Sequence, residues 1–248
     1  MEQTGFFCMM SKKKSDGYQR KLRWLQARFQ EGLRIKMLPL PERGFIEYIS
    51  GDYAWRPIAD ARDYFFIHCL WVVGKSRGQG FARLLLDACV QDARRSGRRG
   101  VAMITSEGNW LISRKMLESY GFKSVEQYAA DSMGPFDLMV LPFKNGKSPT
   151  FTGHLKKTVS RAAPGFTVVR SDQCPYLSDA TEIVRECARE LKVPFRIVDL
   201  QSAADVRAQS ASPYGVFQIL FNGRILSYHY ELKKDLLKKA IATQNAPG

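Results

Sequence analysis

The sequence predicts an α/β protein of two domains: a mixed central sheet with flanking helices, followed by a smaller α/β domain. Apolar runs typical of strands alternate with amphipathic helical patterns in both halves of the chain. Residues 141–166 are rich in Pro, Gly, Ser and Lys without a sustained period, which indicates a linker. A chain of 248 residues that is 45% hydrophobic can bury a sizeable core, and its length lies between that of one large domain and that of two small ones. We therefore expect domains at residues 1–145 and 166–248, joined by a linker at 146–165.

The first half is expected to open with an amphipathic helix over residues 15–32. Its apolar residues recur at spacings of three and four, Ser15 or Asp16 can cap its start, and Gly32 can end it. Alternating or wholly apolar runs predict strands after it, and periodic segments between them predict further helices. The expected strands are residues 33–38, 44–49, 63–73 and 101–105, and the expected helices are residues 81–96 and 111–119.

A glycine-rich turn lies between the long apolar run and the helix that follows, in "VVGKSRGQGFARLLLDA" at residues 72–88. Such a turn allows consecutive main-chain N–H groups to converge on a phosphate, and the helix dipole adds partial positive charge there. Gly78 and Gly80 would let the chain approach the anion, and Arg77 would add a charge-assisted contact. The spacing fits neither a Walker motif nor the dinucleotide fingerprint. The alternative is ordinary turn glycines beside a solvated arginine.

The second half reads as strand, helix, strand, helix, strand, strand and helix. The pair of adjacent strands is expected to form a hairpin, because Asn222-Gly223 is a typical two-residue turn. The expected strands are residues 166–170 and 194–200 and the two hairpin strands within residues 212–228, and the expected helices lie within residues 171–193, 203–209 and 231–241.

Composition and charge restrict the partners. The formal net charge of +14 and a pI near 9.7 predict an anionic partner, which a nucleotide cofactor satisfies as well as a nucleic acid does. The basic segments 11–24 and 94–100 keep nucleic-acid binding as an alternative. Five irregularly spaced cysteines favour a reducing cytoplasm over a disulfide framework. No apolar run approaches the ~18 residues of a membrane span, so no membrane partner is expected, and no metal site is predicted.

The segment "RGQGFA", Arg77 to Ala82, resembles the cofactor loop of the GNAT acetyltransferase superfamily, and "GF" at residues 121–122 follows about forty residues later, as in that superfamily. The chain as a whole is similar to YoaP-type proteins, which join a GNAT domain to a small C-terminal domain; the similarity includes "ERGFIEYI", "AWRPI", "SDQCPY" and "FNG". The resemblance implies a GNAT-like sheet and acetyl-CoA as co-substrate. The residues implied to hold the cofactor are Arg77, Gly78, Gln79, Gly80, Phe81 and Ala82 at the pyrophosphate, and the backbone of Leu70, Trp71 and Val72 along the pantetheine arm.

Two positions depart from the family's pattern. Leu117 stands where many relatives have a tyrosine that protonates the departing thiolate, and Trp110 stands where an asparagine often helps to hold the cofactor. Tyr120 is three residues away and would face elsewhere on a helix. The resemblance implies transfer of an acetyl group to an amine of a small molecule or peptide by direct attack. The alternatives are a CoA-binding or monothiol redox adaptor without acetyl transfer, and a nucleic-acid-binding protein.

Acyl transfer to an amine needs a neutral amine and a proton acceptor. Glu47 and His68 are titratable groups in mid-strand positions, so they are the first candidates, with Cys69 and Tyr120 as further ones. Glu47, His68 and Cys69 each have a non-catalytic alternative: a solvent-facing glutamate of an alternating strand, a core histidine bonded to backbone, and an inert buried cysteine.

The second half resembles a thioredoxin or glutaredoxin fold, with "CPY" at its first helix. The resemblance implies a cis bond at Ser212-Pro213 and a reactive thiol at Cys174, whose pKa a helix N-terminus would lower. Leu177 occupies the place of the second cysteine, which weakens a dithiol exchange reaction. A structural or substrate-recognition module with an idle thiol is one alternative, and monothiol chemistry or transient acyl or metal capture is the other.

Overall fold

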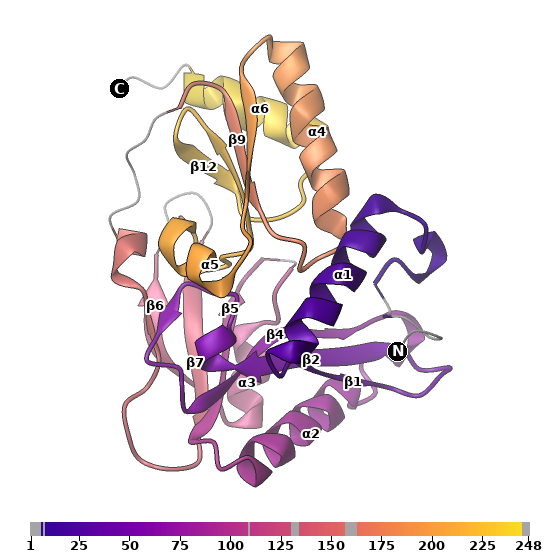
Figure 1. The fold of residues 1–248 in the computed structure, drawn as a ribbon, viewed down its shortest axis with the longest axis vertical. Helices are drawn as coiled ribbons and strands as arrows, with labels where there is room; N and C mark the ends of the chain where they lie inside the picture. The colour runs from indigo at the N-terminus through magenta and orange to yellow at the C-terminus, as the bar shows by residue number, and fades with distance from the viewer. Residues whose placement is uncertain (1–5, 7, 109, 130–133, 157–162, 245–248) are drawn as a thin grey trace.

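In the computed structural model, residues 6, 8–108, 110–129, 134–156 and 163–244 are described. The first half forms a six-stranded sheet in which β4 and β5 are parallel and all other neighbours are antiparallel (Figure 1). Its strands, in order across the sheet, are β1 (Arg34–Met37), β2 (Gly44–Ser50), β4 (Tyr64–Val72), β5 (Gly100–Ser106), β7 (Phe136–Pro142) and β6 (Lys123–Tyr128).

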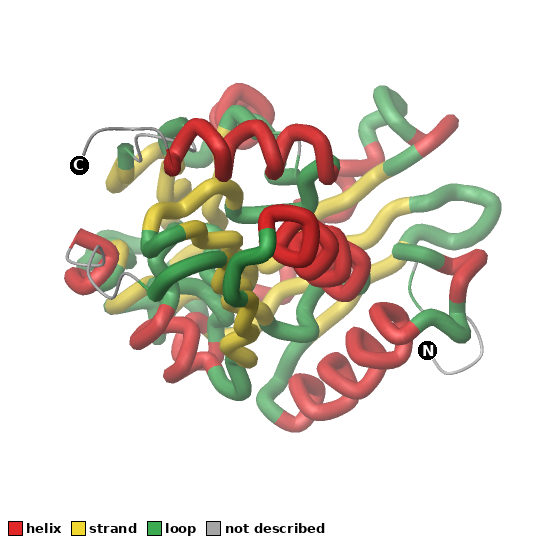
Figure 2. Tube along the Cα trace, turned by 90° about the horizontal axis from the view of Figure 1, so that it is seen from above, coloured by secondary structure: helices red, strands yellow, loops and turns green. Residues whose placement is uncertain are grey.

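The helices of this half are α1 (Asp16–Gln30), α2 (Phe81–Arg95) and α3 (Arg114–Tyr120). The sheet has two buried faces, because alternate residues of β2 enter two different clusters. Ile46 and Tyr48 pack in the cluster that contains the apolar side of α2, whereas Phe45 and Ile49 pack in the cluster that contains α1. One face of the sheet is therefore covered by α1 and the other by α2, so that helices flank the strands (Figure 2).

The second half forms a four-stranded sheet with the helices α4 (Tyr176–Leu191), α5 (Ala203–Gln209) and α6 (Lys233–Gln244). Across the sheet, the strands are β10 (Phe195–Asp199), β9 (Phe166–Arg170), β11 (Phe217–Phe221) and β12 (Arg224–Ser227). β9 and β10 are parallel, and the other pairs are antiparallel. The hairpin turn has positive φ at both Asn222 (49°) and Gly223 (79°), as its residues require.

The predicted helices and strands are confirmed in order and type, with ends shifted by a few residues. The N–H of Tyr18 donates to Ser15 Oγ, so the predicted cap starts α1. The strands β6 and β7 were not predicted, and neither was the short pair β3 (Ile58–Ala59) and β8 (Thr150–Phe151).

Part of the expected linker belongs to the first half. β8 pairs with β3, and Phe151 and Leu155 are buried in the main core, since apolar side chains in this Pro- and Lys-rich stretch still find a place there. Residues 157–162 of that linker lie outside the described residues.

The bond between Ser212 and Pro213 is trans, contrary to the expectation; among the described residues the cis bond is Leu40-Pro41. The N–H of Gly215 donates to the carbonyl of Ser212 at 3.0 Å, which makes Pro213 the second residue of a β-turn. Proline at that position presets φ with a trans bond, whereas a cis proline occupies the third position.

The two halves share one core. The cluster that contains Trp24 and Phe45 of the first half also contains Phe166 and Val184 of the second. At Gly17 a Cβ would lie 2.0 Å from the carbonyl oxygen of Pro175, so glycine permits α1 to begin directly against the start of α4. In Figure 1 the lower end of α4 lies against the upper part of α1. Within the described residues, no helix has the length and apolar character needed to cross a bilayer.

Candidate active site

The glycine loop connects β4 to α2 and has a backbone that only glycine adopts without strain. Gly74, Gly78 and Gly80 have φ of 61°, 78° and 81°. Gly80 is the N-cap of α2 without a side-chain cap, and its carbonyl accepts from the N–H groups of Arg83 and Leu84 at 3.0 and 3.2 Å. Among the described residues, no acceptor faces the N–H groups of residues 78–82. The loop therefore presents consecutive donors at a helix start, which fits a diphosphate.

β4 and β5 separate next to this loop. They pair from Tyr64 with Gly100 to Ile67 with Met103 and no further, although β4 continues to Val72. On its other edge, β4 stays paired with β2 up to Val72 and Gly44. In the described part of the chain, the edge of β4 that faces β5 is thus free of strand partners from His68 onward, which leaves room for an extended molecule to pair with it.

A cavity of about 840 Å³ runs from the glycine loop, along β4, to the junction with the second half. It brings together three of the predicted catalytic residues, Glu47, His68 and Cys69, with Cys174. The predicted cofactor residues along it are Leu70, Trp71, Val72, Arg77, Gly78, Gly80, Phe81 and Ala82. Gln79, Tyr120 and Pro213 do not line it.

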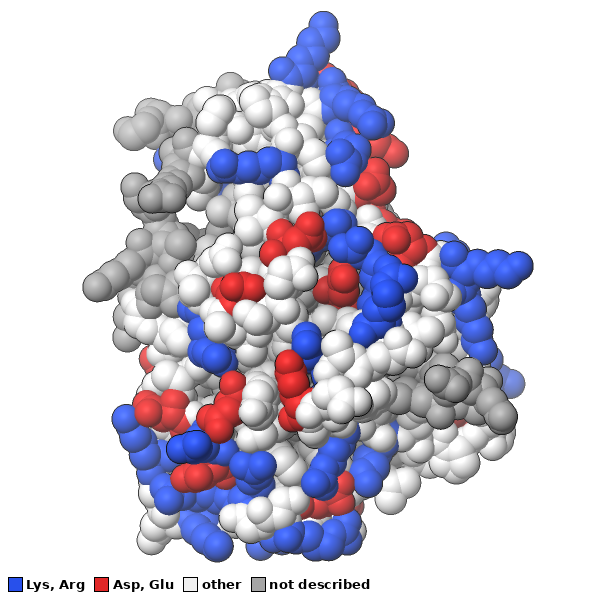
Figure 3. Space-filling model, in the orientation of Figure 1, with Lys and Arg blue, Asp and Glu red and all other residues white. Residues whose placement is uncertain are grey.

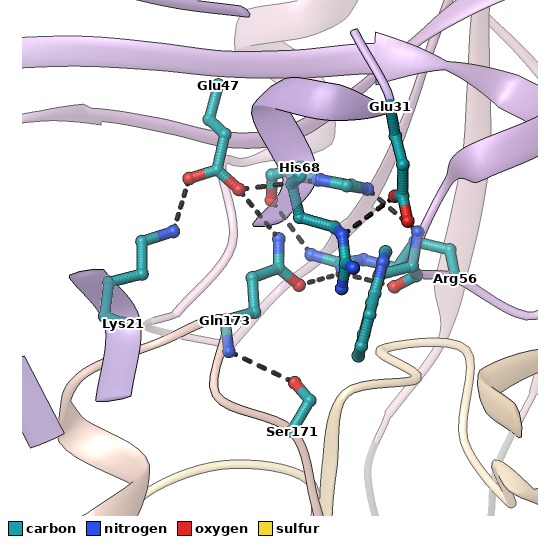
Figure 4. A network of polar contacts seen from close by, with 9 residues as sticks. Lys21, Glu31, Glu47, Arg56, His68, Ser171 and Gln173 are labelled. Carbon is teal, nitrogen blue, oxygen red and sulfur yellow. Dashed lines mark hydrogen bonds and ion pairs between the residues drawn. The ribbon is translucent and has the colours of Figure 1, made fainter. Parts of the chain in front are cut away.

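A network of buried polar side chains forms the inner end of the cavity (Figure 4). Glu47 Oε2 accepts from Lys21 Nζ of α1 at 2.5 Å, and Oε1 accepts from Gln173 Nε2 of the second half at 3.1 Å. Glu47 is fully buried, so it is not a solvent-facing strand residue; alternation in β2 points it, like Phe45 and Ile49, to the face that α1 covers.

His68 occupies a bulge in β4. Glu47 pairs with Cys69 and Tyr48 pairs with Ile67, which leaves His68 as the extra residue. Its Nε2 accepts from the main-chain N–H of Trp55 at 2.9 Å, and its Nδ1 lies 3.4 Å from Glu47 Oε1. The neutral ring therefore carries its proton on Nδ1 and has no free lone pair with which to accept a proton from a substrate.

The charge states in the network follow from burial and from its cations. Burial alone would raise the pKa of Glu47, but Lys21 and the His68 ring hold it at about 2. Burial lowers the pKa of His68 to about 4, and the nearby Glu47 offsets this in part. Glu47 is thus an anion and a weak base, and His68 is neutral at pH 7.

Arg56 is the second cation of the network, and it is 2% exposed. Its Nη1 donates to the Trp55 carbonyl at 2.6 Å and to Gln173 Oε1 at 2.7 Å, and its Nη2 donates to the His68 carbonyl at 2.9 Å. Sequence reasoning missed Lys21, Arg56 and Gln173 as site residues. A signal existed for Arg56 alone, a charged residue inside the apolar "AWRPI".

The cysteines of the cavity are protonated thiols at pH 7. Burial raises the pKa of Cys69 to about 12. Burial also raises the pKa of Cys174 to about 11, because it outweighs the N–H of Tyr176 and the nearby cations. The expected lowering at Cys174 is therefore wrong. Its Sγ lies 3.9 Å from Nε2 of His229.

The two departures from the expected pattern, Leu117 in α3 and Trp110 before it, lie in different environments. Leu117 is fully buried in the core on the α2 side, and the Tyr120 hydroxyl donates to Asp87 at 2.5 Å, away from the cavity. Trp110, which precedes α3, lines the cavity and stacks on His229 of the second half with ring centroids 3.8 Å apart. This geometry gives no support to a catalytic Tyr120.

Comparison with known proteins agrees with the sequence motif. The model of the acetyltransferase (GNAT) family matches residues 10–122. A protein from Bacillus subtilis (strain 168) described as "Uncharacterized N-acetyltransferase YoaP" is 30% identical over 232 residues, which cover 92% of this chain and 90% of that protein.

Among solved structures, a ribosomal-protein-alanine N-acetyltransferase from Brucella melitensis is 19% identical and has a TM-score of 0.42, over 51% of this chain and 78% of that chain. The acetyltransferase yncA from Salmonella typhimurium, solved with its cofactor acetyl-CoA, is 20% identical and has a TM-score of 0.41, over 54% and 78%. The family match and the near full-length relative together show that this chain belongs to the GNAT family of acetyltransferases.

Proposed function

We propose that this protein transfers the acetyl group of acetyl-CoA to an amine of a small molecule or peptide by direct attack. One observation carries the proposal: a single cavity joins the glycine loop at the start of α2, the free edge of β4 and the buried charged network. A cofactor bound at one end of this cavity and an acceptor bound at the other would meet beside Cys69 and Leu70.

The outer end of the cavity fits the cofactor. The N–H groups of residues 78–82 and the exposed guanidinium of Arg77 would hold the diphosphate. The free edge of Leu70 to Val72 would pair with the amide groups of the pantetheine arm. Acetyl-CoA supplies the thioester carbonyl that the amine attacks, and a solved relative, yncA, is described with acetyl-CoA as its cofactor.

The inner end would favour a neutral amine without a side-chain base. Lys21 and Arg56 carry two positive charges there against the single negative charge of Glu47. A bound ammonium would be disfavoured by this excess, so the acceptor would enter as the free amine. As the new N–C bond forms and the C–S bond breaks, the nitrogen's proton would pass to the departing thiolate sulfur.

The second half is proposed to be a thioredoxin-like domain from residue 166 that serves as a wall of the acceptor site. The GNAT domain is proposed to comprise residues 1–145 together with β8 and Leu155, which pack on it. Its strand order and strand directions support that likeness. Leu177 in place of a second cysteine and the raised pKa of Cys174 argue against redox exchange. The described cysteines are all free, which fits a reducing cytoplasm.

Calorimetry tests the cofactor site first. Acetyl-CoA should release heat with the wild type and bind at least about tenfold more weakly to Arg77→Glu, since one charge-assisted contact becomes a repulsion. Lys238→Glu, an exposed charge reversal on α6, is the matched control and should bind as the wild type does. Absence of heat, or equal affinity in both variants, would contradict the cofactor site.

Thiol release in the presence of amines then tests turnover. Release with at least one amine supports acetyl transfer, whereas acetyl-CoA binding without release across amino acids, peptides, polyamines and antibiotics would favour a CoA-binding adaptor. On the face shown in Figure 3, Lys and Arg are interspersed with Asp and Glu, which does not favour a nucleic-acid surface.

A further inference from the structure

Arg56 is a buried cation whose charge no described carboxylate neutralises. Its three hydrogen bonds go to two main-chain carbonyls and to an amide oxygen, and no acidic side chain among the described residues lies within ion-pair distance of it. Glu47 is already paired with Lys21. A buried charge without a counter-ion is costly, so such a group in a cavity wall is typical of a site that receives an anion.

Arg56 still has donors to offer. A guanidinium has five N–H bonds, and these three hydrogen bonds use two on Nη1 and one on Nη2, which leaves one on Nη2 and one on Nε without an acceptor among the described residues. The Tyr214 ring lies 5.2 Å from the guanidinium carbon, and no described group is bonded to its hydroxyl. Arg56 and Tyr214 both line the cavity, so a charged donor and a phenol ring lie against each other in its wall.

A row of aromatic rings continues from this pair along the cavity wall. Tyr214 lies 5.3 Å from His229 between ring centroids, and His229 stacks on Trp110 at 3.8 Å. Tyr176 lies 6.0 Å from Trp110. All four rings line the cavity, and Trp110 is 41% exposed, so its indole is available to a bound molecule. Flat rings of this kind stack preferentially on another flat apolar group.

We propose that the acetyl acceptor is an amine that also carries a carboxylate and an aromatic group, an aromatic α-amino acid in its simplest form. The carboxylate would bind Arg56 and Tyr214, the ring would lie against Trp110, and the amine would point to the thioester beside β4. This inference rests on the proposed acetyl transfer, and the second half of the chain supplies Tyr214, Tyr176 and His229 to the acceptor site.

A cationic acceptor fits this end of the cavity less well. Aromatic rings can also surround an ammonium group, but the Arg56 guanidinium already occupies a face of Tyr214. Burial, and after it Arg56, lowers the pKa of His229 to about 3, so His229 adds no charge of either sign. The excess positive charge of Lys21 and Arg56 over Glu47 therefore selects for a carboxylate and against a second ammonium.

The test compares three acceptors that differ at one group: L-phenylalanine, L-phenylalaninamide and phenethylamine. Thiol release is measured at a pH above the amine pKa of all three, so that each reacts as the free amine. We expect kcat/KM for phenylalanine to exceed that for the other two by at least about tenfold, since a buried cation left without its anion penalises them. Equal or faster turnover of phenethylamine or the amide would overturn the proposal.

Variants assign the preference to Arg56. In Arg56→Lys the ratio of phenylalanine to phenylalaninamide should fall by about tenfold, because an ammonium cannot reproduce the planar donors. Arg23→Gln, which removes an exposed arginine of α1, should keep the wild-type ratio. An unchanged ratio in a folded Arg56→Lys would overturn the assignment. If that variant no longer binds acetyl-CoA or fails to fold, the wild-type series alone decides.

The two proposals fail in distinguishable ways. Absence of thiol release with every amine would overturn acetyl transfer, and calorimetry with phenylalanine and phenethylamine would still decide whether a carboxylate site exists. Heat from phenylalanine alone would support that site, and heat from neither or from both equally would overturn it. Thiol release that ignores the carboxylate would leave acetyl transfer standing and remove the acceptor class.

Discussion

The two ends of the cavity are built from different parts of the chain. The outer end is main chain: exposed N–H groups of one continuous loop, held open by glycines with positive φ. The inner end is side chain: a fully buried network that Lys21 of α1, Glu47 of β2, Arg56 and Gln173 form from four distant segments. We infer that changes at the outer end alter mainly cofactor affinity, whereas changes at the inner end alter the stability of both halves together.

The largest effect is expected at Glu47. In Glu47→Ala, Lys21 is left as a buried charge without its partner, and we expect the free energy of unfolding to fall by about 3–5 kcal/mol. Urea denaturation measures the change. Glu118→Ala removes a half-exposed partner of Arg114 and should cost less than about 1 kcal/mol. Equal losses in both variants would contradict the difference between buried and exposed pairs.

The next effect is a loss of stability in acid. His68 and His229 have pKa values of about 4 and about 3 in the folded chain, below the usual 6.5, because both rings are buried. As the pH falls from 6.5 toward 4, the unfolded chain takes up protons that the folded chain does not. Each ring then costs roughly 1.4 kcal/mol per pH unit, and this stability is fully present only above pH 6.5.

The titratable groups that face these two rings do not reverse the loss of stability in acid. Glu47, Arg56 and Lys21 face His68, and Arg56 and the Cys174 thiol face His229. Glu47 itself, with a pKa of about 2 against 4.5, adds a further loss below pH 4.5. Urea denaturation at pH 7, 6 and 5 measures the slope of the unfolding free energy against pH. His229→Gln should reduce that slope between pH 6 and 5 by the contribution of one proton, roughly 1.4 kcal/mol per pH unit. A stability independent of pH in this range would contradict the neutral buried histidines.

A smaller effect separates the two ends of α2. Gly80 before the helix and Gly97 after it both have positive φ, at 81° and 67°, and a Cβ at either would meet no protein atom within 4 Å. Alanine at either position should cost about 1 kcal/mol of stability through backbone strain. Acetyl-CoA affinity should fall in Gly80→Ala alone, by about tenfold, because Gly80 lines the cavity among the N–H groups proposed to hold the diphosphate and Gly97 does not. Equal affinities in the two variants would place the cofactor elsewhere.

The difference between the ends also explains what the sequence could predict. The loop is local: its strand, its glycines and its helix follow one another within residues 64–95, so the sequence pattern alone predicts a glycine turn at a helix start. The network is not local: Lys21 and Gln173 are 152 positions apart, yet both bond to Glu47. No periodicity or spacing rule joins such positions, and β2 alternation alone could not tell a buried glutamate from a solvated one.

The errors have the same physical origin. Cys174 was expected to have a lowered pKa from its helix N-terminus, but its partly buried position at the junction of the two halves, which raises that pKa, was not visible in the local sequence. The Ser212-Pro213 bond was expected to be cis from the fold resemblance, whereas the turn closed by Gly215 uses the trans form. Both depend on tertiary contacts that the local patterns do not encode.

The smallest effect concerns the thiol at the junction. With a pKa of about 11, Cys174 is almost wholly protonated at pH 7, so alkylation by iodoacetamide should be slow there and should accelerate with each pH unit up to about pH 10. Mass spectrometry of the peptide that contains Cys174 follows the rate, and a cysteine-containing model peptide with an ordinary thiol is the control. Faster alkylation of Cys174 than of that peptide at pH 7 would reveal a thiolate, and it would restore monothiol chemistry as a role for the second half. Slow alkylation leaves that half with the role its aromatic side chains support, a wall that closes the acceptor end of the cavity.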